Sequence, residues 1–452
     1  MGRLFGTDGV RGIANEMLTC ERALAIGRAA ANVLFPKKGG DTRKILIGSD
    51  TRQSSAMLAA ALAAGICSVG ADVTMLNVVP TPAVAYLVRK YGAAAGVMIS
   101  ASHNSAEFNG IKIFNGEGFK LADELEERIE SVVLDNTPPC TLADPLSLGT
   151  VHYADCAVDD YIDYIRSTTD VRFDGLRVAI DCANGSASVS AERLFTGLGA
   201  ECHMLFHTPD GLNINKNCGS THMENLREYV ISHKLDAGLA FDGDADRFLC
   251  VDDHGEIIDG DVIMAVMAAD MKRRGVLAHN TVVGTIMTNF GFGKFCEENG
   301  IDFIATKVGD RYVLEQMQLE GYSLGGEQSG HIIIREFATT GDGQLTAVQL
   351  LSTLIRTKKK LSELQTVMKK YPQKMVNLTV TPEAKIALFT DPDVKEIIRR
   401  AEKKIGSSGR LVIRPSGTEP LIRVMAEGEN EDFIASVTSE TAAAIQKQLS
   451  RY

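Results

Sequence analysis

Residues 44–65 read KILIGSDTRQSSAMLAAALAAG, and this stretch decides the fold class. Its first part, KILIGSD, is a short aliphatic run that ends in polar residues, as a buried strand does. Its second part, SSAMLAAALAAG, predicts a helix whose N-terminus Ser54 or Ser55 caps. A further strand pattern, AGVMIS, follows at 95–100. This order of strand, helix and strand predicts βα units in a largely parallel sheet.

The same alternation returns twice along the chain and then changes. LRVAID and DAGLAFD are strand patterns of a second block, and TVVGTI and DFIAT belong to a third. The last block has the strand patterns MVNLTV, RLVIRPSG and LIRVMAEG with two flanking helices. We therefore predict an α/β protein of three similar α/β domains, with mixed, mostly parallel sheets, plus a smaller C-terminal α+β domain. The predicted domains are 1–153, 154–254, 255–368 and 369–452.

Composition narrows the possible partners. A chain of 452 residues suits roughly three or four domains. The net charge of -11 argues against nucleic acid as a partner, although local basic clusters still allow an anionic substrate. Nine cysteines without a CxxC pair predict reduced thiols in the cytoplasm. No leader or membrane-spanning pattern is recognised, so we expect no membrane association.

Three aspartates alternate in FDGDADR, residues 241–247, directly after an apolar strand pattern. Carboxylates spaced by two in a turn can converge on one hard cation. An EF-hand calcium loop is excluded, because Arg247 stands where that loop has glycine. Three carboxylates with open positions suit Mg²⁺ that also binds a phosphate oxygen. The predicted metal ligands are Asp242, Asp244 and Asp246, and the alternative is a surface turn of capping aspartates.

A second polar motif, RPSGTEP, begins at Arg414. Its small residues would let backbone N–H groups and hydroxyls surround an anion, and arginines supply forked donors. It is not a Walker loop, since GK[ST] is missing. The alternative is a tight polar turn between strands. The predicted phosphate-binding residues are Arg414, Ser416, Gly417, Thr418 and Arg423.

A third motif, GGEQSGH, ends at His331. Glu327 and Ser329 on a glycine-rich turn are suited to hydrogen bonds with sugar hydroxyls. His331 could donate to a phosphate or transfer a proton. The alternative is a polar turn without a functional role.

The fourth motif, ISASHNSAEFNG, holds two serines two positions apart and a histidine after the second. We expect Ser102 to be better exposed than Ser100, because it lies where the strand gives way to a polar loop. A hydrolase triad fits poorly, since no GxSxG elbow is present and His103 is adjacent to Ser102. The alternative is a serine that only caps the loop. Further cations that could contact phosphate are Arg11, Arg52, Lys112, Lys307 and Arg311.

Taken together, the motifs resemble those of a known family. TDGVRG, ISASHN, DGDADR, GEQSGH and RPSGTEP match the motifs of the α-D-phosphohexomutases in order and spacing. The resemblance runs the length of the chain and implies four domains around a central cleft. It also implies a homodimer.

The resemblance implies a role for each motif. Ser102 would carry a phosphoryl group as phosphoserine, and one Mg²⁺ would bind to this group and the three aspartates. Glu327 and Ser329 would hold the sugar, and the RPSGTEP motif with Arg423 would hold the phosphate that does not react. The residues implied in contacts with the reacting phosphate and in proton transfer are Arg11, Lys112 and His331.

FGTDGVRG together with GEQSGH most resembles the amino-sugar branch of the family. This implies interconversion of glucosamine 6-phosphate and glucosamine 1-phosphate, which feeds cell-wall precursor synthesis. The intermediate or activator would be glucosamine 1,6-bisphosphate or glucose 1,6-bisphosphate. The rival readings are a mutase of glucose or mannose phosphates, a metal-dependent sugar phosphatase and a sugar-phosphate binder without activity.

One position departs from the family pattern. Ser105 follows His-Asn, where the family usually has proline. Without the proline ring, φ is freer and a backbone donor is added, so we expect a more mobile loop.

Overall fold

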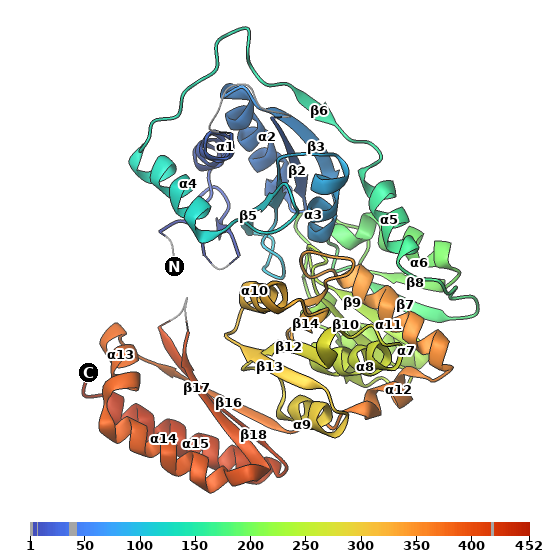
Figure 1. The fold of residues 1–452 in the computed structure, drawn as a ribbon, viewed down its shortest axis with the longest axis vertical. Helices are drawn as coiled ribbons and strands as arrows, with labels where there is room; N and C mark the ends of the chain where they lie inside the picture. The colour runs from blue at the N-terminus through green and yellow to red at the C-terminus, as the bar shows by residue number, and fades with distance from the viewer. Residues whose placement is uncertain (1–2, 7, 36–42, 417–419) are drawn as a thin grey trace.

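The computed structural model describes residues 3–6, 8–35, 43–416 and 420–452. Within these residues the strands form four separate sheets, each with its own helices (Figure 1). Three sheets are mixed and the fourth is antiparallel. The predicted fold class, three α/β units followed by a smaller C-terminal unit, is confirmed.

The first sheet has six strands in the order β1-β5-β4-β2-β3-β6. Parallel pairs join β2 to β3 and β4, while β5 runs antiparallel to β1 and β4. The strands are β1 Val10–Ile13, β2 Lys44–Ser49, β3 Asp72–Val78, β4 Ala95–Ile99, β5 Phe108–Asn115 and β6 Val151–Tyr153. The helices are α1 Cys20–Leu34, α2 Gln53–Ser68, α3 Thr81–Lys90 and α4 Asp123–Asp135.

The strands predicted at 44–50 and 95–100 and the alanine-rich helix are therefore confirmed. The predicted serine cap is wrong. Arg52 is the N-cap residue of α2, and its side chain makes no capping bond. The Ser55 hydroxyl instead donates to Asp50 Oδ1 at 3.0 Å, because the carboxylate at the end of β2 competes for it.

The second sheet has the order β11-β10-β9-β7-β8, with β7 parallel to β8 and β9. Its strands are β7 Arg177–Asp181, β8 Glu201–Leu205, β9 Ala237–Phe241, β10 Phe248–Asp252 and β11 Ile257–Ile258. Its helices are α5 Ala157–Ser167, α6 Ala191–Leu198 and α7 Glu224–His233.

The third sheet has the order β13-β12-β14-β15. Its strands are β12 Thr281–Thr285, β13 Asp302–Thr306, β14 Leu324–Gly326 and β15 Ile332–Ile334. Its helices are α8 Gly260–Arg273, α9 Phe290–Glu298, α10 Asp310–Glu320, α11 Gly343–Thr357 and α12 Leu361–Leu364. The domain boundaries proposed from the sequence remain predictions.

The C-terminal sheet is antiparallel in the order β16-β18-β17. Its strands are β16 Gln373–Thr379, β17 Gly409–Pro415 and β18 Leu421–Gly428, and its helices are α13 Pro382–Thr390, α14 Pro392–Ile405 and α15 Glu431–Leu449. The sequence predicted two helices in this unit, and the described residues form three. Asp391 ends α13 and caps α14 by accepting from the N–H groups of Asp393 and Val394, and Pro392 starts the new helix.

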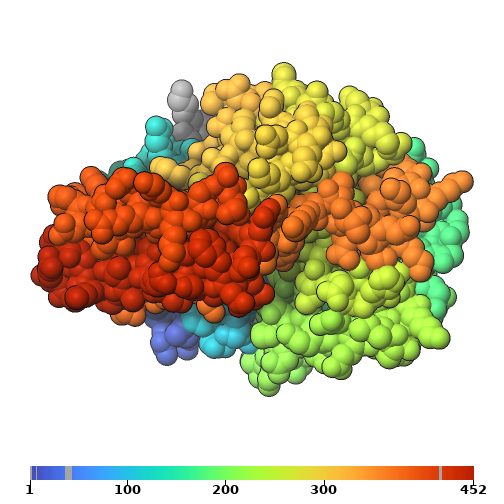
Figure 2. Space-filling model, turned by 90° about the horizontal axis from the view of Figure 1, so that it is seen from below, coloured from blue at the N-terminus to red at the C-terminus, as the bar shows by residue number. Residues whose placement is uncertain are grey.

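The buried core connects the first three units and leaves the C-terminal unit apart. One apolar cluster joins the first three units and includes Val84 of α3, Ile165 of α5, Ala265 of α8 and Leu351 of α11. The C-terminal unit has a cluster of its own, which includes Val424 of β18. In Figure 2 this unit is a lobe beside the rest of the molecule. The described helices include none that is both long and apolar enough to cross a membrane.

Helices α1 and α2 approach one another closely at two glycines. A Cβ atom at Gly65 would lie 2.2 Å from the carbonyl oxygen of Leu24, and one at Gly27 would lie 2.4 Å from that of Leu62. Both obstacles are backbone atoms, so they can yield only if the helices move apart. This contact between the helices therefore requires glycine.

We predict that Gly65→Ala lowers the first unfolding temperature by about 5 °C, because the helices must separate to admit the methyl group. Differential scanning calorimetry measures this. The matched control is Gly293→Ala in α9, where an added Cβ meets nothing within 4 Å. That change is expected to leave the temperature equal or slightly raised. Equal effects of the two changes would contradict the packing account.

Candidate active site

Strand β9 ends in a tight turn that gathers the three aspartates of DGDADR. One carboxylate oxygen from each of Asp242, Asp244 and Asp246 lies within 4.8 Å of the other two. The turn is closed by the Ala245 N–H, which donates to the Asp242 carbonyl at 3.0 Å. All three side chains are buried. A surface turn of capping aspartates is therefore excluded.

The electrostatics of the triad suit a hard cation. Among the described residues, Asp244 Oδ1 and Asp246 Oδ1 are buried without a hydrogen-bond partner. Burial, together with the charges of Asp246 and Asp244, raises the pKa of Asp242 well above its usual value. Buried carboxylate oxygens without partners are costly unless a cation binds them. The donor set, three carboxylates converging from one turn, fits Mg²⁺.

Lys112 of β5 reaches the triad from the first unit. Its Nζ lies 2.9 Å from Asp244, 3.0 Å from Asp8 and 3.5 Å from Asp246. Burial opposes the charge of this ammonium, but the surrounding carboxylates outweigh it and raise the pKa of Lys112 well above its usual value. Lys112 is therefore a permanent positive charge at the site.

Ser102 faces the triad from the loop after β4. Its Oγ donates to Asp242 Oδ2 at 2.6 Å, and its backbone has a left-handed φ of 54°. The expectation that Ser102 is better exposed than Ser100 is wrong, since the two are 1% and 0% exposed. The second unit explains this, because its turn packs on the loop: a Cβ at Gly243 would lie 2.6 Å from the Ser102 carbonyl oxygen.

His103 is not arranged as a base for Ser102. Its Nδ1 is 3.4 Å from Ser102 Oγ, whereas the Asp242 carboxylate accepts from the same hydroxyl at 2.6 Å. Burial and the nearby Arg247 and Arg11 lower the pKa of His103 to about 4. The geometry therefore does not favour a serine–histidine hydrolase.

Two buried side chains hold the serine loop by its backbone. Arg52 Nη2 donates to the carbonyls of Ser102 and Asn104 at 3.0 and 2.7 Å. Asn215 Nδ2, from the second unit, donates to the same carbonyls at 2.9 Å each. The Ser105 carbonyl also accepts from Arg52. Arg52, expected as a phosphate-binding cation, thus binds the loop instead, and the greater mobility expected from Ser105 remains a prediction.

The sequence reading missed four side chains that complete this region. Thr81, at the N-terminus of α3, donates to Asp244 Oδ2 at 2.6 Å. Lys120 forms ion pairs with Asp8 and Asp310. Asp8 lies in the quoted TDGVRG motif, and Asp310 directly precedes Arg311, one of the cations named from the sequence, so these neighbours were the only signal. Thr81 and Lys120 carried no signal of their own.

His331 follows the GEQSG turn and is buried beside the triad. Its Nδ1 lies 3.6 Å from Asp246 Oδ2, and its Nε2 accepts from the Gly341 N–H at 3.0 Å. The neutral imidazole therefore carries its proton on Nδ1, towards Asp246. Burial lowers the pKa of His331, but Asp246 and Asp310 outweigh it and raise the pKa overall.

A cleft of about 670 Å³ lies between the four units and is lined by seven of the predicted site residues. The first unit contributes Arg11, which forms an ion pair with Asp8. The cleft-lining residues that the sequence predicted are Arg11, Asp246, Glu327, His331, Arg414, Ser416 and Arg423. Ser102 and Lys112 lie buried beside the cleft, next to the triad.

Two arginines face the cleft from the C-terminal unit. Arg414 of β17 is directly opposite Arg423 of β18 in the strand register. Burial and the charge of Arg423 lower the pKa of Arg414. Like charges directly opposite one another are destabilising, so the pair suits an anion between them. Gly417 and Thr418 lie outside the described residues.

The GEQSG turn carries a carboxylate and a hydroxyl that could bind a polar ligand. Glu327 Oε1 accepts from the Gly309 N–H at 3.1 Å. The Ser329 Oγ is buried and has no hydrogen-bond partner among the described residues.

Two of the cations named from the sequence lie away from the cleft. Arg311 forms ion pairs with Asp123 and Glu315, and the Lys307 ammonium lies over the Tyr312 ring. These last two do not line the cleft with the other cations.

Comparison with known proteins agrees with the motifs and the geometry. The alpha/beta/alpha domains I, II and III of phosphoglucomutase/phosphomannomutase match residues 2–139, 159–255 and 259–371, and the C-terminal domain matches residues 375–444. The chain belongs to the phosphoglucomutase/phosphomannomutase family. The resemblance to phosphohexomutases seen in the sequence is thereby confirmed.

Similar curated proteins are named phosphoglucosamine mutase. That of Acetivibrio thermocellus is 51% identical over 449 residues, which cover 99% of this chain and 100% of that protein. That of Clostridium novyi is 51% identical over 448 residues, with 99% of each chain covered.

Solved structures share the fold. A phosphoglucomutase/phosphomannomutase family protein of Burkholderia thailandensis has a TM-score of 0.82 at 22% identity and covers 100% of this chain and 98% of its own. The N-acetylphosphoglucosamine mutase of Aspergillus fumigatus, in complex with GlcNAc-6P and magnesium, has a TM-score of 0.68 at 16% identity, with coverage of 99% and 96%. At these identities the likeness shows the fold alone.

We predict that the protein binds one Mg²⁺ and that Asp244→Asn weakens this binding at least about tenfold, because a charged ligand is lost. Isothermal titration calorimetry without substrate measures it. The matched control is Asp163→Asn, whose side chain is 74% exposed on α5. Its Mg²⁺ affinity should equal that of the parent. Equal affinities for all three proteins would contradict the assignment of the triad as the metal site.

Proposed function

We propose that the protein is a phosphoglucosamine mutase, an isomerase that interconverts glucosamine 6-phosphate and glucosamine 1-phosphate. One observation carries the proposal: Ser102 donates to a buried aspartate triad on one side of a cleft whose other side bears two facing arginines. A nucleophile opposite an anion-binding pair suits a substrate with two alternative phosphate positions. The relatives that match the whole chain at 51% identity carry this name.

The reaction runs through two phosphoryl transfers. In the first, the bond between phosphorus and Ser102 Oγ breaks as a bond to the C1 hydroxyl oxygen of glucosamine 6-phosphate forms, and the hydroxyl proton leaves to a base. The product is glucosamine 1,6-bisphosphate. After the intermediate turns round, its 6-phosphoryl group returns to Ser102 Oγ, the C6 oxygen regains a proton, and glucosamine 1-phosphate is released.

His331 is the group that accepts and returns the proton, and it does so at Nε2 once the substrate hydroxyl replaces the Gly341 N–H as the partner of that atom. Lys112 is held in its charged form by three carboxylates, so it lacks the lone pair that a base needs. Lys112 and Arg11 instead neutralise charge on the reacting phosphoryl group. His331 lines the cleft, and its conjugate acid would be stabilised by Asp246 and Asp310.

The remaining residues bind and orient the substrate. Glu327 and Ser329 hold sugar hydroxyls in either orientation, and the unpartnered Ser329 Oγ gives one such bond. The phosphate that does not react is held by Arg414, Ser416, Gly417, Thr418 and Arg423. Because one anion site faces one phosphoserine, the same residues serve both transfers.

Mg²⁺ would be held by a phosphoserine oxygen at Ser102 and by Asp242, Asp244 and Asp246, where it neutralises phosphoryl charge. The activators that follow from this chemistry are glucosamine 1,6-bisphosphate and glucose 1,6-bisphosphate, since either can phosphorylate Ser102. A homodimer in the cytoplasm completes the proposal.

The second anion site favours a mutase over a sugar phosphatase. A mutase must hold the phosphate that does not react while the other is transferred, and Arg414 and Arg423 face the cleft where they can do so. A phosphatase that releases phosphate to water has no such need of a second anion site. The choice of glucosamine over glucose or mannose rests on the relatives, because an amino group and a hydroxyl at C2 are nearly the same size.

We predict that Ser102→Ala lowers turnover of glucosamine 6-phosphate by at least about 10⁴-fold, because the phosphoryl carrier is lost. A coupled assay started with glucose 1,6-bisphosphate measures turnover, and circular dichroism checks the fold. The matched control is Ser105→Ala, an exposed serine of the same loop, which should retain parental turnover. Near-normal turnover in Ser102→Ala would refute the mechanism.

We also predict that kcat/KM is highest for glucosamine 6-phosphate among the 6-phosphates of glucosamine, glucose and mannose, by about tenfold or more. Steady release of inorganic phosphate should stay below about 1% of mutase turnover. A preference for glucose 6-phosphate would overturn the substrate assignment, and stoichiometric phosphate release would favour the phosphatase.

A further inference from the structure

The paired strands β17 and β18 have different contacts at their two ends. At one end, Arg414 lies opposite Arg423 and both line the cleft. Further along the same register, Arg410 lies opposite Glu427. At about 3.4 Å per residue, these two pairs are roughly 14 Å apart along the strands. Any tilt of the strands about the second pair therefore moves the first pair.

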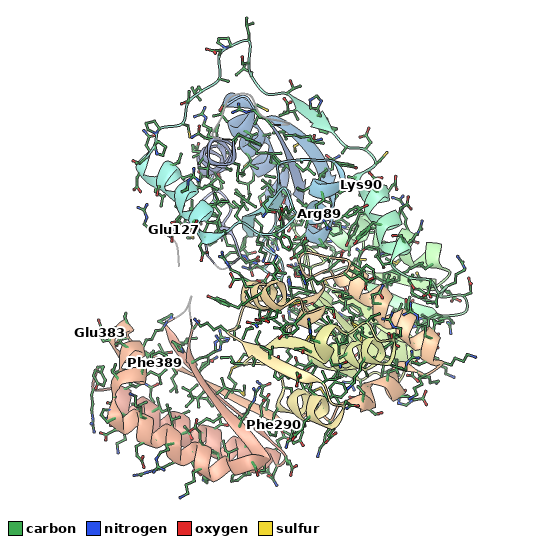
Figure 3. The ribbon with its side chains drawn as sticks, viewed as in Figure 1. Arg89, Lys90, Glu127, Phe290, Glu383 and Phe389 are labelled. Carbon is green, nitrogen blue, oxygen red and sulfur yellow. The ribbon has the colours of Figure 1, made fainter. Side chains whose placement is uncertain are left out.

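The second pair is fastened to the third unit. Glu427 is completely buried, and its Oε2 accepts from Arg410 Nε at 2.7 Å and from the Phe290 N–H at 3.1 Å. Its Oε1 accepts from Asn289 Nδ2 at 3.3 Å. Figure 3 labels Phe290 at this junction between α9 and the C-terminal sheet. A carboxylate of β18 is thus bound to the first residues of α9.

The connecting segment is fastened at the same place. Asn289 exchanges two hydrogen bonds with the backbone of Tyr371, each 3.0 Å long. Arg410 also donates to the Thr288 carbonyl. We call Asn289, Tyr371, Arg410 and Glu427 the strand anchor.

The strand anchor lies next to a polar connection to the sugar-binding turn. Lys370, which precedes Tyr371, forms an ion pair with Asp259 Oδ2 at 2.5 Å. The same oxygen accepts from Gln328 Nε2 at 3.3 Å. Gln328 stands between Glu327 and Ser329 in the GEQSG turn. Polar contacts therefore link the position of the C-terminal strands to the turn that faces the sugar.

The orientation of the C-terminal unit depends on these directional contacts. Its apolar cluster is separate from the cluster that joins the first three units. Apolar packing is non-directional, whereas hydrogen bonds and ion pairs weaken when their geometry changes. A rotation of about 10° at the strand anchor would move the arginine pair by about 2 Å, and misplacement by about 1 Å can lower rates about 100-fold.

We propose that Glu427 and Arg410 are positioning residues that set the place of the Arg414–Arg423 pair over the cleft, and thereby the affinity for the phosphate that does not react. That this phosphate belongs to a sugar substrate rests on the proposed mutase function. The contacts of the strand anchor are independent of that function.

A double-mutant cycle tests this proposal. Glu427→Gln keeps the shape of the side chain but removes the charge that faces Arg410. In the parent background we expect kcat/KM for glucosamine 6-phosphate to fall about tenfold, mainly through KM, because binding rather than chemistry is affected. In an Arg414→Ala/Arg423→Ala background the same change should alter kcat/KM by less than about twofold, since both positioned groups are gone. Equal losses in both backgrounds would overturn the proposal.

Two further variants separate positioning from folding. Glu396→Gln removes a charge from the exposed ion pairs of α14 in the same unit, and it should leave kcat/KM within about twofold. Arg410→Lys keeps the charge but loses the forked contacts to Glu427 and Thr288, and it should reproduce the rise in KM. If Glu427→Gln fails to fold by calorimetry, Arg410→Lys is compared in the same two backgrounds, and equal losses there would refute the proposal.

A binding measurement distinguishes failure of this inference from failure of the proposed function. Isothermal titration calorimetry with inorganic phosphate measures binding and needs no turnover. Glu427→Gln should weaken phosphate binding about tenfold in the parent background and leave it unchanged when Arg414 and Arg423 are both alanine. A parent protein without mutase turnover would refute the function alone, whereas equal phosphate affinities of the parent and Glu427→Gln would refute the strand anchor.

Discussion

The repulsion among three buried carboxylates is the constraint on which the site depends. Two like charges about 4 Å apart repel by about 4 kcal/mol at an effective dielectric constant of about 20. Asp242, Asp244 and Asp246 are held this close by a single turn, and all three can be ionised together only beside cations. Lys112 supplies one such charge from the first unit, and the unpartnered oxygens of Asp244 and Asp246 suit a second. The serine that would carry phosphate donates to the same group of carboxylates, so the nucleophile and the cations are placed together.

The arrangement of three units around one core, with a fourth unit beside them, suits this chemistry. The first three units share one apolar cluster, so the loop of Ser102, the turn of the three aspartates and the GEQSG turn belong to one packed body. The C-terminal unit has its own core and brings its arginines to the cleft on the ends of two strands. A reaction that binds one sugar in two orientations needs a fixed phosphoryl carrier and an anion site opposite to it. The fold supplies the first from the packed body of three units and the second from the C-terminal unit.

Much of the fold and part of the site could be predicted from the sequence, because both depend on local patterns. The alternation of apolar strands and helices predicted the three α/β units, and the spacing of the aspartates predicted their convergence. Contacts between distant segments could not be predicted this way. The burial of Ser102 comes from the turn at Gly243, and the role of Arg52 comes from carbonyls about 50 positions away in the chain. The same holds for Thr81, whose hydroxyl is paired with Asp244 of another unit.

The central claim is that Ser102 carries a phosphoryl group and passes it to the sugar. The most direct measurement uses protein that carries radiolabelled phosphate on Ser102, mixed with unlabelled glucosamine 6-phosphate for a single turnover. The account predicts that the label leaves the protein and appears in the sugar bisphosphate and in glucosamine 1-phosphate. A label that stays on the protein while product forms, or that appears only as inorganic phosphate, would contradict it.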